Sequence, residues 1–169
     1  MATNLEVKCR LASCAEAHDA ARRLGATLHA TLSQRDTYFH VPHGRLKLRT
    51  INGTSAELIQ YDRPDTMGDR WSTYTRVPVA DPGVLEDALT RALGVRGVVE
   101  KVRGVYLYKS ARIHIDEVEG QGSFLEFEVV ETAPEEASRL MVELRRAFSV
   151  REEAIIAGSY ADMPKQNKT

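Results

Sequence analysis

The stretch Asn4-Leu5-Glu6-Val7-Lys8-Cys9-Arg10-Leu11 alternates strictly between polar and apolar side chains. A period of two predicts a β-strand with one polar and one apolar face. Arg45-Leu46-Lys47-Leu48-Arg49-Thr50-Ile51 repeats this alternation, as does Arg112-Ile113-His114-Ile115-Asp116. Because lysine and glutamate are poor strand formers, their repeated placement in strands favours a functional use of the polar face.

Working outward from the first strand, the chain carries further strand signals. They fall at residues 4–11, 31–41, 45–51, 56–63, 71–77, 98–108, 112–118 and 124–130. Asn52-Gly53 is the favoured two-residue turn of a β-hairpin. These segments predict a sheet whose neighbouring strands are antiparallel.

Three helices are expected between and after the strands. Ser13 and Thr132, each followed three residues later by glutamate, fit the capping-box pattern, and Asp81 precedes a proline at the third start. Gly25 and Gly94 are expected to end the first two helices. The second helix has an apolar stripe with the spacing of a helix laid on a sheet. The stripe comprises Val84, Leu85, Ala88, Leu89 and Ala92.

The order of these elements predicts an α+β domain built on an antiparallel sheet. The apolar strand faces and the amphipathic helices indicate that the helices cover the outside of the sheet. If the sheet closes into a barrel or tunnel, its charged face lies inside. We expect one domain over residues 1–163, with a short helical piece at 152–157 and a disordered tail at 164–169.

The charge of the proposed inner face is far from that of the whole chain. It has ten bases and five acids, an excess of five positive charges, whereas the formal net charge of the chain is −1. The bases are Lys8, Arg10, Arg45, Lys47, Arg49, Arg63, Arg76, Lys101, Arg103 and Arg112, and the acids are Glu6, Glu57, Asp116, Glu126 and Glu128. A polyphosphate of about four negative charges, with a divalent cation, would balance such a cavity. The alternative is a sheet whose charged face is simply solvated.

The acidic side chains suggest a metal site. Glu126 and Glu128 share one strand face, and Glu6 can lie opposite them. Oxygen ligands suit Mg2+ or Mn2+, which also bind phosphates directly. His114 is open between a further ligand, a substrate contact and an ordinary hydrogen-bonded histidine.

Composition excludes several partner classes. The near-neutral chain gives no reason to expect nucleic acid, and no apolar run reaches the roughly 18 residues of a membrane span. Cys9 and Cys14 lack the second pair of a zinc site and fit a reduced compartment, so we expect a cytoplasmic protein. Monomer and homodimer both stay open.

The ordered set of motifs resembles the CYTH superfamily, the triphosphate tunnel metalloenzymes, and looks most similar to its bacterial class IV adenylate cyclase-like branch. The matching pieces run from residue 4 to about 130 in the family's order. They are Leu5-Glu6-Val7-Lys8, Gln34-Arg35-Asp36-Thr37-Tyr38-Phe39, Gly44-Arg45-Leu46-Lys47-Leu48-Arg49, Glu57-Leu58-Ile59-Gln60-Tyr61 with Arg63-Pro64, Lys101-Val102-Arg103, and Arg112-Ile113-His114-Ile115-Asp116-Glu117-Val118 through Phe124-Leu125-Glu126-Phe127-Glu128.

The resemblance implies an eight-stranded antiparallel tunnel and a role for each matching residue. The implied metal ligands are Glu6, Glu126 and Glu128, with Asp116 close to the metal. The implied triphosphate-binding residues are Lys8, Lys47, Arg49, Arg63, Lys101, Arg103 and Arg112. The chain departs from the family's Glu-x-Glu-x-Lys signature at Asn4, whose amide offers an oxygen without a charge, so one metal site is expected to be weaker or altered.

These expectations give an Mg2+- or Mn2+-dependent enzyme acting on a triphosphate such as ATP. In the cyclase version ATP yields cyclic AMP and pyrophosphate. In the hydrolase version water attacks the terminal phosphorus of a nucleoside, thiamine or inorganic triphosphate. Lys8, Asp116 and Arg112 are expected at the reacting centre, and the general base is open between Glu6, Asp116 and Lys8. A non-catalytic polyphosphate-binding module is the further alternative.

The charge argument also makes a prediction about stability. Replacing Lys47 or Arg103 by alanine would relieve like-charge repulsion, so each variant is expected to lose activity while its fold stays intact or becomes slightly more stable.

Overall fold

A computed structural model describes residues 1–130 and 132–165 of the chain. The strands are β1 (Ala2–Leu11), β2 (Thr27–Phe39), β3 (Arg45–Ile51), β4 (Ser55–Asp62), β5 (Arg70–Pro78), β6 (Val95–Tyr108), β7 (Ala111–Val118) and β8 (Gly122–Val130). The helices are α1 (Cys14–Leu24), α2 (Pro82–Leu93) and α3 (Pro134–Ala147), followed by the 3-10 turns η1 (Glu152–Ala154) and η2 (Tyr160–Asp162).

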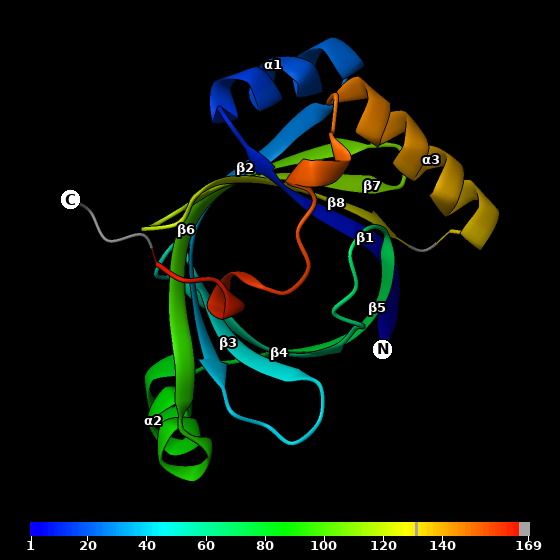
Figure 1. The fold of residues 1–169 in the computed structure, drawn as a ribbon. Coiled ribbons are helices and arrows are strands. Elements are labelled where there is room, and N and C mark those ends of the chain that lie inside the picture. The colour runs from blue at the N-terminus through cyan, green and yellow to red at the C-terminus, as the bar shows by residue number, and fades with distance from the viewer. Residues whose placement is uncertain (131, 166–169) are drawn as a thin grey trace.

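The strands form one closed barrel. Their order around it is β1-β5-β4-β3-β2-β6-β7-β8, and every neighbouring pair is antiparallel. Closure occurs because β1 pairs with β5 on one side and with β8 on the other. Figure 1 looks into the resulting ring, with the helices outside it. The expected α+β fold, a closed eight-stranded antiparallel barrel, is confirmed.

The alternation in β1 separates the inside of the barrel from its outer core. Leu5, Val7 and Cys9 are buried in an apolar cluster that β7, β8, α1 and α3 complete. Asn4 and Glu6, on the opposite face, line the cavity inside the ring. One residue of register therefore decides which side chains meet apolar core and which meet the cavity.

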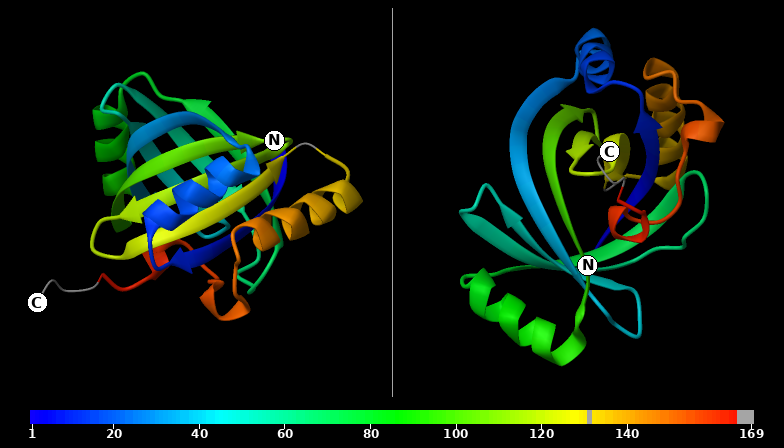
Figure 2. Two further views of the ribbon diagram at one scale, coloured as in Figure 1. Left: turned by 90° about the horizontal axis from the view of Figure 1, so that it is seen from above. Right: turned by 60° about the vertical axis from the view of Figure 1, so that its left-hand side comes forward.

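The helices cover the barrel unevenly. α1 and α3 lie side by side over β7, β8 and β1, and α2 lies apart from them, against β2 and β3 (Figure 2). The stripe expected on α2 is partly wrong. Leu85 and Leu89 pack on the sheet, but Val84 is 67 % exposed. α2 meets the sheet along one narrow row, which also includes Leu93, so the flanking positions of the stripe face away.

Some of the expected turns and helix caps form and others do not. Asn52 and Gly53 have φ of 52° and 65°, as the expected hairpin turn requires, and Gly25 ends α1 at φ 82°. The Asp81 side chain accepts a hydrogen bond from the Val84 amide. Ser13 makes no side-chain cap bond.

At α3 the expected capping box does not form. The N-cap is Ala133, because Pro134 occupies the first helical turn, and Thr132 lies one residue before that N-cap. Its hydroxyl donates to the Glu136 carboxylate instead.

The C-terminal segment closes one end of the barrel. After η1 the chain pairs Ile155 with Cys9 and then crosses the ring to η2 (orange to red in Figure 1). Tyr160, only 1 % exposed, packs there with Tyr38, Tyr61 and Phe124.

Two expectations about the C-terminal part of the chain have different outcomes. The helical piece expected at 152–157 is shorter, since only Glu152–Ala154 forms a 3-10 turn. The tail expected at 164–169 falls mainly on residues 166–169, which lie outside the described residues, and the division into a domain over 1–163 and a tail stays a prediction.

Two further observations concern partners and cysteines. No helix within the described ranges is long and apolar enough to cross a membrane. Cys9 is buried, and burial raises the pKa of its thiol to about 11. Such a thiol is an inert core group.

Candidate functional site

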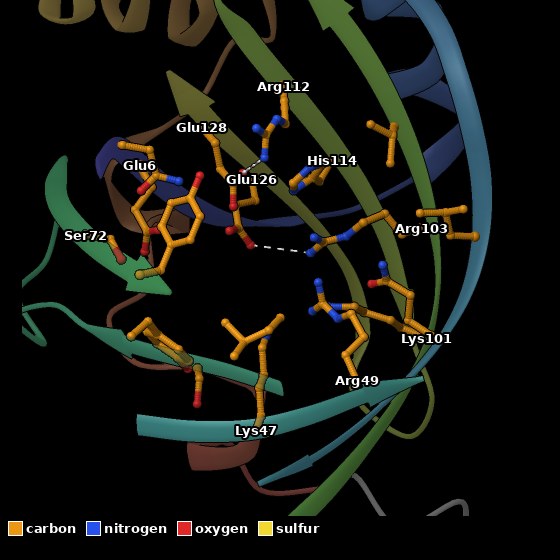
Figure 3. Close-up of a pocket in the computed structure, with 18 of the residues that line it drawn as sticks. Glu6, Lys47, Arg49, Ser72, Lys101, Arg103, Arg112, His114, Glu126 and Glu128 are labelled. Carbon is orange, nitrogen blue, oxygen red and sulfur yellow. Dashed lines mark ion pairs between the residues drawn. The ribbon is translucent and has the colours of Figure 1, made fainter. Parts of the chain in front are cut away.

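A charged cavity of about 370 Å3 fills the barrel. Among the described residues, eight bases and four acids line it. The bases are Lys8, Lys47, Arg49, Arg63, Arg76, Lys101, Arg103 and Arg112, and the acids are Glu6, Glu57, Glu126 and Glu128. The side chains labelled in Figure 3, among them Lys47, Arg103 and Glu126, converge from different strands. The excess of bases gives the cavity a positive potential that favours the entry of a multiply charged anion.

The barrel register sets neighbours of opposite charge against each other. Lys8 lies opposite Glu126 on the β1–β8 ladder, and Arg112 lies opposite Glu128 on the β7–β8 ladder. The Lys8 Nζ is 3.3 Å from a Glu126 oxygen, and an Arg112 nitrogen is 3.6 Å from a Glu128 oxygen. The antiparallel pairing thus aligns opposite charges whether they are far apart in the chain, as Lys8 and Glu126 are, or close together, as Arg112 and Glu128 are.

Two buried aspartates hold the deepest cations. Arg49 donates two bonds of 2.7 Å to Asp36, and Lys47 lies 3.1 Å from the same carboxylate. Arg103 donates bonds of 2.7 and 2.6 Å to Asp116. Lys101 lies between the two, 3.9 Å from Asp36 and 3.7 Å from Asp116. This arrangement fixes two guanidinium groups while leaving Lys101 with only long contacts.

The pKa values of these groups follow from burial and from their neighbours. Burial alone would raise the pKa of Asp36, but Arg49, Lys47 and Lys101 outweigh it and hold that pKa well below its usual value. Asp116 follows the same pattern, with its pKa lowered by Arg103 and Lys101 against the effect of burial. Both carboxylates therefore stay ionised.

The lysines respond in the opposite direction. Burial, then the neighbouring Arg49, lowers the pKa of Lys47 to about 8. Burial and Arg103 hold the pKa of Lys101 well below its usual value. An anion entering the cavity would favour the charged form of both lysines.

Tyr160 forms the floor of the cavity. Its hydroxyl donates a 2.8 Å hydrogen bond to Asp116. Its ring lies under Lys8 and Lys101, with the two Nζ atoms 4.0 and 4.9 Å from the ring centroid. A cation over an aromatic face is stabilised by the ring's charge distribution, so Tyr160 helps to hold both lysines inside the barrel.

Three ligand-type side chains gather on β7 and β8. One potential ligand atom from each of His114, Glu126 and Glu128 lies within 4.8 Å of the others. Burial, then the charges of Glu126 and Glu6, raises the pKa of Glu128 to about 7. Burial also holds the pKa of His114 well below its usual value, which keeps the imidazole neutral and able to act as a ligand. Neutral imidazole and carboxylate oxygens fit a divalent cation.

Glu6 and Asp116 stand outside that cluster. The Glu6 carboxylate pairs with Arg63 and lies 3.3 Å from the Arg70 Nε. The Asp116 oxygens are bonded to Arg103 and Tyr160. The structure therefore brings Glu126 and Glu128 together with His114, and it gives Asp116 cations rather than other ligands as neighbours.

Other predicted residues also have identifiable positions. Arg76 and Glu57 line the cavity, with 41 % and 20 % of their side chains exposed. Arg63 also donates a 2.6 Å bond to the Gly158 carbonyl.

Two bases assigned to the inner face do not line the cavity. Arg45 pairs with Asp65 and Asp162 at the end that the C-terminal segment covers. Arg10 lies at the exposed end of β1, over the Phe124 ring. Both residues lie on the strand face that points into the barrel, but they lie beyond the end of the cavity.

Several site residues were missed by sequence reasoning. Asp36 lies in a quoted motif but received no role, although its place opposite Arg49 on the β2–β3 ladder was a usable signal. Arg70 lies just before the strand expected at 71–77 and received no role, but it begins β5 and its Nε lies 3.3 Å from Glu6. Tyr160 and Ser159 belong to a segment without strand or helix periodicity, so the local pattern gave no signal for them.

One wall of the cavity is apolar. Ala30 and Leu32 of β2, Ile51 of β3 and Val105 of β6 line it, and the exposed His29 stands beside them. Phosphate groups gain nothing from such a surface, whereas an organic group does.

Comparison with known proteins agrees with this geometry. The model of the CYTH domain matches residues 2–160. A search of curated protein sequences found no match. The PH1012 protein of Pyrococcus horikoshii is 26 % identical, with a TM-score of 0.87 over 97 % of this chain and 99 % of that one.

Two more distant structures share the fold. A Vibrio parahaemolyticus protein named as a candidate adenylate cyclase is 17 % identical, with a TM-score of 0.69 over 94 % of this chain and 95 % of that one. A Hippeastrum protein named as a candidate adenylyl cyclase with a dominant triphosphatase activity is 16 % identical, with a TM-score of 0.66 over 92 % and 91 %.

Proposed function

The chain belongs to the CYTH domain family, and from that premise we propose that it is a divalent-metal-dependent enzyme that acts on organic triphosphates. Members of this family are usually enzymes, either adenylate cyclase-like or triphosphatases. The reaction that we propose first is that of class IV adenylate cyclases, in which ATP yields cyclic AMP and pyrophosphate.

The observation that supports this proposal is the charge of the cavity. Eight bases and four acids line the cavity, and the ionised Asp36 and Asp116 offset two more positive charges, so a triphosphate of about four negative charges with one divalent cation would neutralise the surplus of two. Because Tyr160 and Ser159 cover one end, the phosphates would enter from the other end. The organic group would then lie toward the apolar wall of Ala30, Leu32 and Val105.

The bases divide into two groups by their existing contacts. Arg49 and Arg103 are held by Asp36 and Asp116, so they would present fixed N–H groups to the innermost phosphate. Lys8, Lys47 and Lys101 would supply point charges, and Arg63 and Arg112 would reach phosphates nearer the mouth. We assign Asp116 to positioning Arg103 and Tyr160 rather than to binding metal.

In the cyclase reaction the ribose 3′-oxygen forms a bond to the α-phosphorus while the bond from that phosphorus to the bridging oxygen breaks. The hydroxyl proton is released, and pyrophosphate carries the extra negative charge. Lys8 and Arg112 lie beside the carboxylate cluster and would stabilise that charge as it develops. The residues proposed to hold the cation are Glu126 and Glu128, with Glu6 adjacent. A bound cation would act as a Lewis acid and neutralise charge on the phosphate oxygens.

A triphosphatase is the second candidate. Asn4 stands where the family signature has a glutamate, which changes the metal environment on β1. The Hippeastrum relative, named for a dominant triphosphatase activity, favours considering hydrolysis. Water would then attack the terminal phosphorus as the bond from that phosphorus to its bridging oxygen breaks, and the same bases would stabilise the diphosphate that leaves and the orthophosphate that forms.

The test is incubation of the purified protein with Mn2+ or Mg2+ and a panel of ATP, GTP, thiamine triphosphate and inorganic tripolyphosphate, followed by product identification. Cyclic AMP with pyrophosphate supports the first reaction, and orthophosphate supports the second. Saturable binding without turnover of any of these compounds would instead identify a non-catalytic binding module. Lys47→Ala, inside the cavity, should lose turnover. Lys109→Ala, on the surface, is its matched control and should keep turnover.

A further inference from the structure

The β7–β8 side of the cavity contains a cluster that differs from an all-oxygen metal site. It joins the imidazole of His114 to the carboxylates of Glu126 and Glu128, with one potential ligand atom of each within 4.8 Å of the others. His114 and Glu126 are 5 % and 7 % exposed. All three side chains face the lumen (Figure 3).

One nitrogen of the His114 ring is unsatisfied. Its Nδ1 is buried and has no hydrogen-bond partner within the described part of the chain. More than about nine in ten buried polar groups have a partner, and exceptions often mark a missing water or ion. This unpartnered nitrogen is therefore a second observation, independent of the carboxylates, that indicates a ligand at the cluster.

The contacts of the carboxylates distinguish this cluster from an ordinary ion-pair network. Asp36 and Asp116 receive arginine bonds of 2.6 to 2.7 Å. The nearest cations of Glu126 and Glu128 are farther away, at 3.3 Å and 3.6 Å. Charge-assisted bonds normally fall near 2.7–2.9 Å, so these two carboxylates retain oxygen lone pairs for another ligand.

The neighbouring strand β1 offers fewer free ligand atoms to a cation. Glu6 of β1 is engaged by Arg63 and Arg70. Asn4, two residues earlier, contributes only a neutral amide whose buried oxygen also has no partner among the residues described. The strongest remaining ligand set is consequently on β7 and β8.

We propose that the divalent cation binds between the His114 imidazole and the carboxylates of Glu126 and Glu128, and that this nitrogen ligand makes the site selective for Mn2+ or Co2+ over Mg2+. Imidazole is a ligand for first-row transition metals, whereas Mg2+ takes an octahedral shell of oxygen atoms. The inference rests on the proposed function in assuming a cation in the cavity, but it makes a separate statement about which atoms hold that cation.

The decisive measurement is pulsed electron paramagnetic resonance of the Mn2+-loaded protein, without nucleotide, recorded at natural abundance and after labelling with 15N-histidine. The expected result is a nitrogen modulation that changes to the 15N pattern on labelling. Mn2+ binding without nitrogen modulation, or no Mn2+ binding, would overturn the proposal. The labelling needs no substitution, so it does not depend on the stability of a variant.

Two variants locate the nitrogen. His114→Gln should remove the modulation and weaken Mn2+ binding about tenfold or more, with a smaller effect on Mg2+. His29→Gln is the matched control, because His29 lines the same cavity outside the cluster. Loss of the modulation in His29→Gln but not in His114→Gln would assign the ligand elsewhere and contradict the proposal.

The proposal and the proposed function fail in different ways. Nitrogen coordination without turnover of any triphosphate would leave this site intact and reject the enzyme. Turnover with a metal bound only through oxygen would reject this site and leave the enzyme intact.

Discussion

Lys47 and Arg103 both carry positive charge into the cavity, but their partners give them different effects on stability. Lys47 shares Asp36 with Arg49, so that carboxylate keeps a bidentate partner if Lys47 is removed. Arg103 is the bidentate partner of Asp116, which is 0 % exposed. The contacts therefore predict that Arg103→Ala is destabilised, contrary to the expectation from charge repulsion. For Lys47→Ala the expectation of an intact or slightly more stable fold is unchanged.

We predict that Arg103→Ala lowers the free energy of unfolding by about 3 kcal/mol, because it leaves the Asp116 carboxylate buried without its main counterion. Chemical denaturation measures this change. Arg91→Ala, which removes an exposed arginine paired with Asp87 on α2, is the control and should change stability by less than about 0.5 kcal/mol. Equal stability of Arg103→Ala and the wild type would contradict the assigned role of the ion pair.

The lowered pKa of Lys47 leads us to expect that anion binding depends on pH. The pKa of this lysine in the folded protein is lowered to about 8, so the lysine loses its charge as the pH rises through that value. Since an anion binds best to the protonated form, the affinity for tripolyphosphate in EDTA should fall above pH 8, by at most about tenfold per pH unit for one proton.

The matched variant for this titration is Lys47→Arg, whose charge persists at high pH. Its affinity should change less between pH 8 and pH 10 than that of the wild type. Parallel pH profiles for the two proteins would show that another group controls the effect.

At the scale of elements, the C-terminal segment supplies what the strands lack. The barrel ladders supply charged side chains, but the floor comes from Tyr160 in η2. The segment is fastened by long-range contacts: Arg45 to Asp162, Arg63 to the Gly158 carbonyl, and Gln121 to the Tyr160 carbonyl. An irregular chain thus becomes a fixed part of the site.

Tyr160→Phe should lower the free energy of unfolding by about 1.5–3 kcal/mol, the range for a hydrogen bond to a charged group, because Asp116 loses a buried donor. Tyr108→Phe is the control, since its hydroxyl donates to Glu143, whose side chain is 39 % exposed. Urea denaturation compares the two. An equal loss in both variants would mean that the Tyr160 hydroxyl has no special role at the floor.

What the sequence could predict depends on whether an element has a local period. β1 and β3 were recognisable because alternation fixes which side chains enter the lumen, and the order of strands identified the barrel. The crossing of the segment around Tyr160 depends on partners such as Asp116, 44 positions away, and leaves no local period. The same limit explains Arg45 and Arg10, because parity identifies a face but not where the lumen ends.

For the molecule as a whole, the cavity concentrates charge that the chain does not carry in total. The net charge is −1, yet bases outnumber acids two to one around the lumen among the described residues. Helices and the outer core hold the charged faces together despite their mutual repulsion. A bound polyanion should relieve that repulsion and stabilise the folded barrel.

We predict that inorganic tripolyphosphate, in EDTA, raises the melting temperature more than sodium chloride of equal ionic strength. The shift in melting temperature should shrink as sodium chloride is added, because its ions screen the cavity bases and chloride competes for them. Differential scanning calorimetry measures it. An equal effect of both salts would indicate general ionic stabilisation instead of a bound ligand.

The central claim, that the barrel interior is a triphosphate receptor, is tested most directly by isothermal titration calorimetry of tripolyphosphate into the wild type, Lys47→Ala and Lys109→Ala in EDTA. The account predicts saturable binding at one site, weakened about tenfold or more by Lys47→Ala, because a charge-assisted contact contributes about 1.5–3 kcal/mol, and unchanged by Lys109→Ala. No saturable binding, or the same affinity in all three proteins, would contradict it.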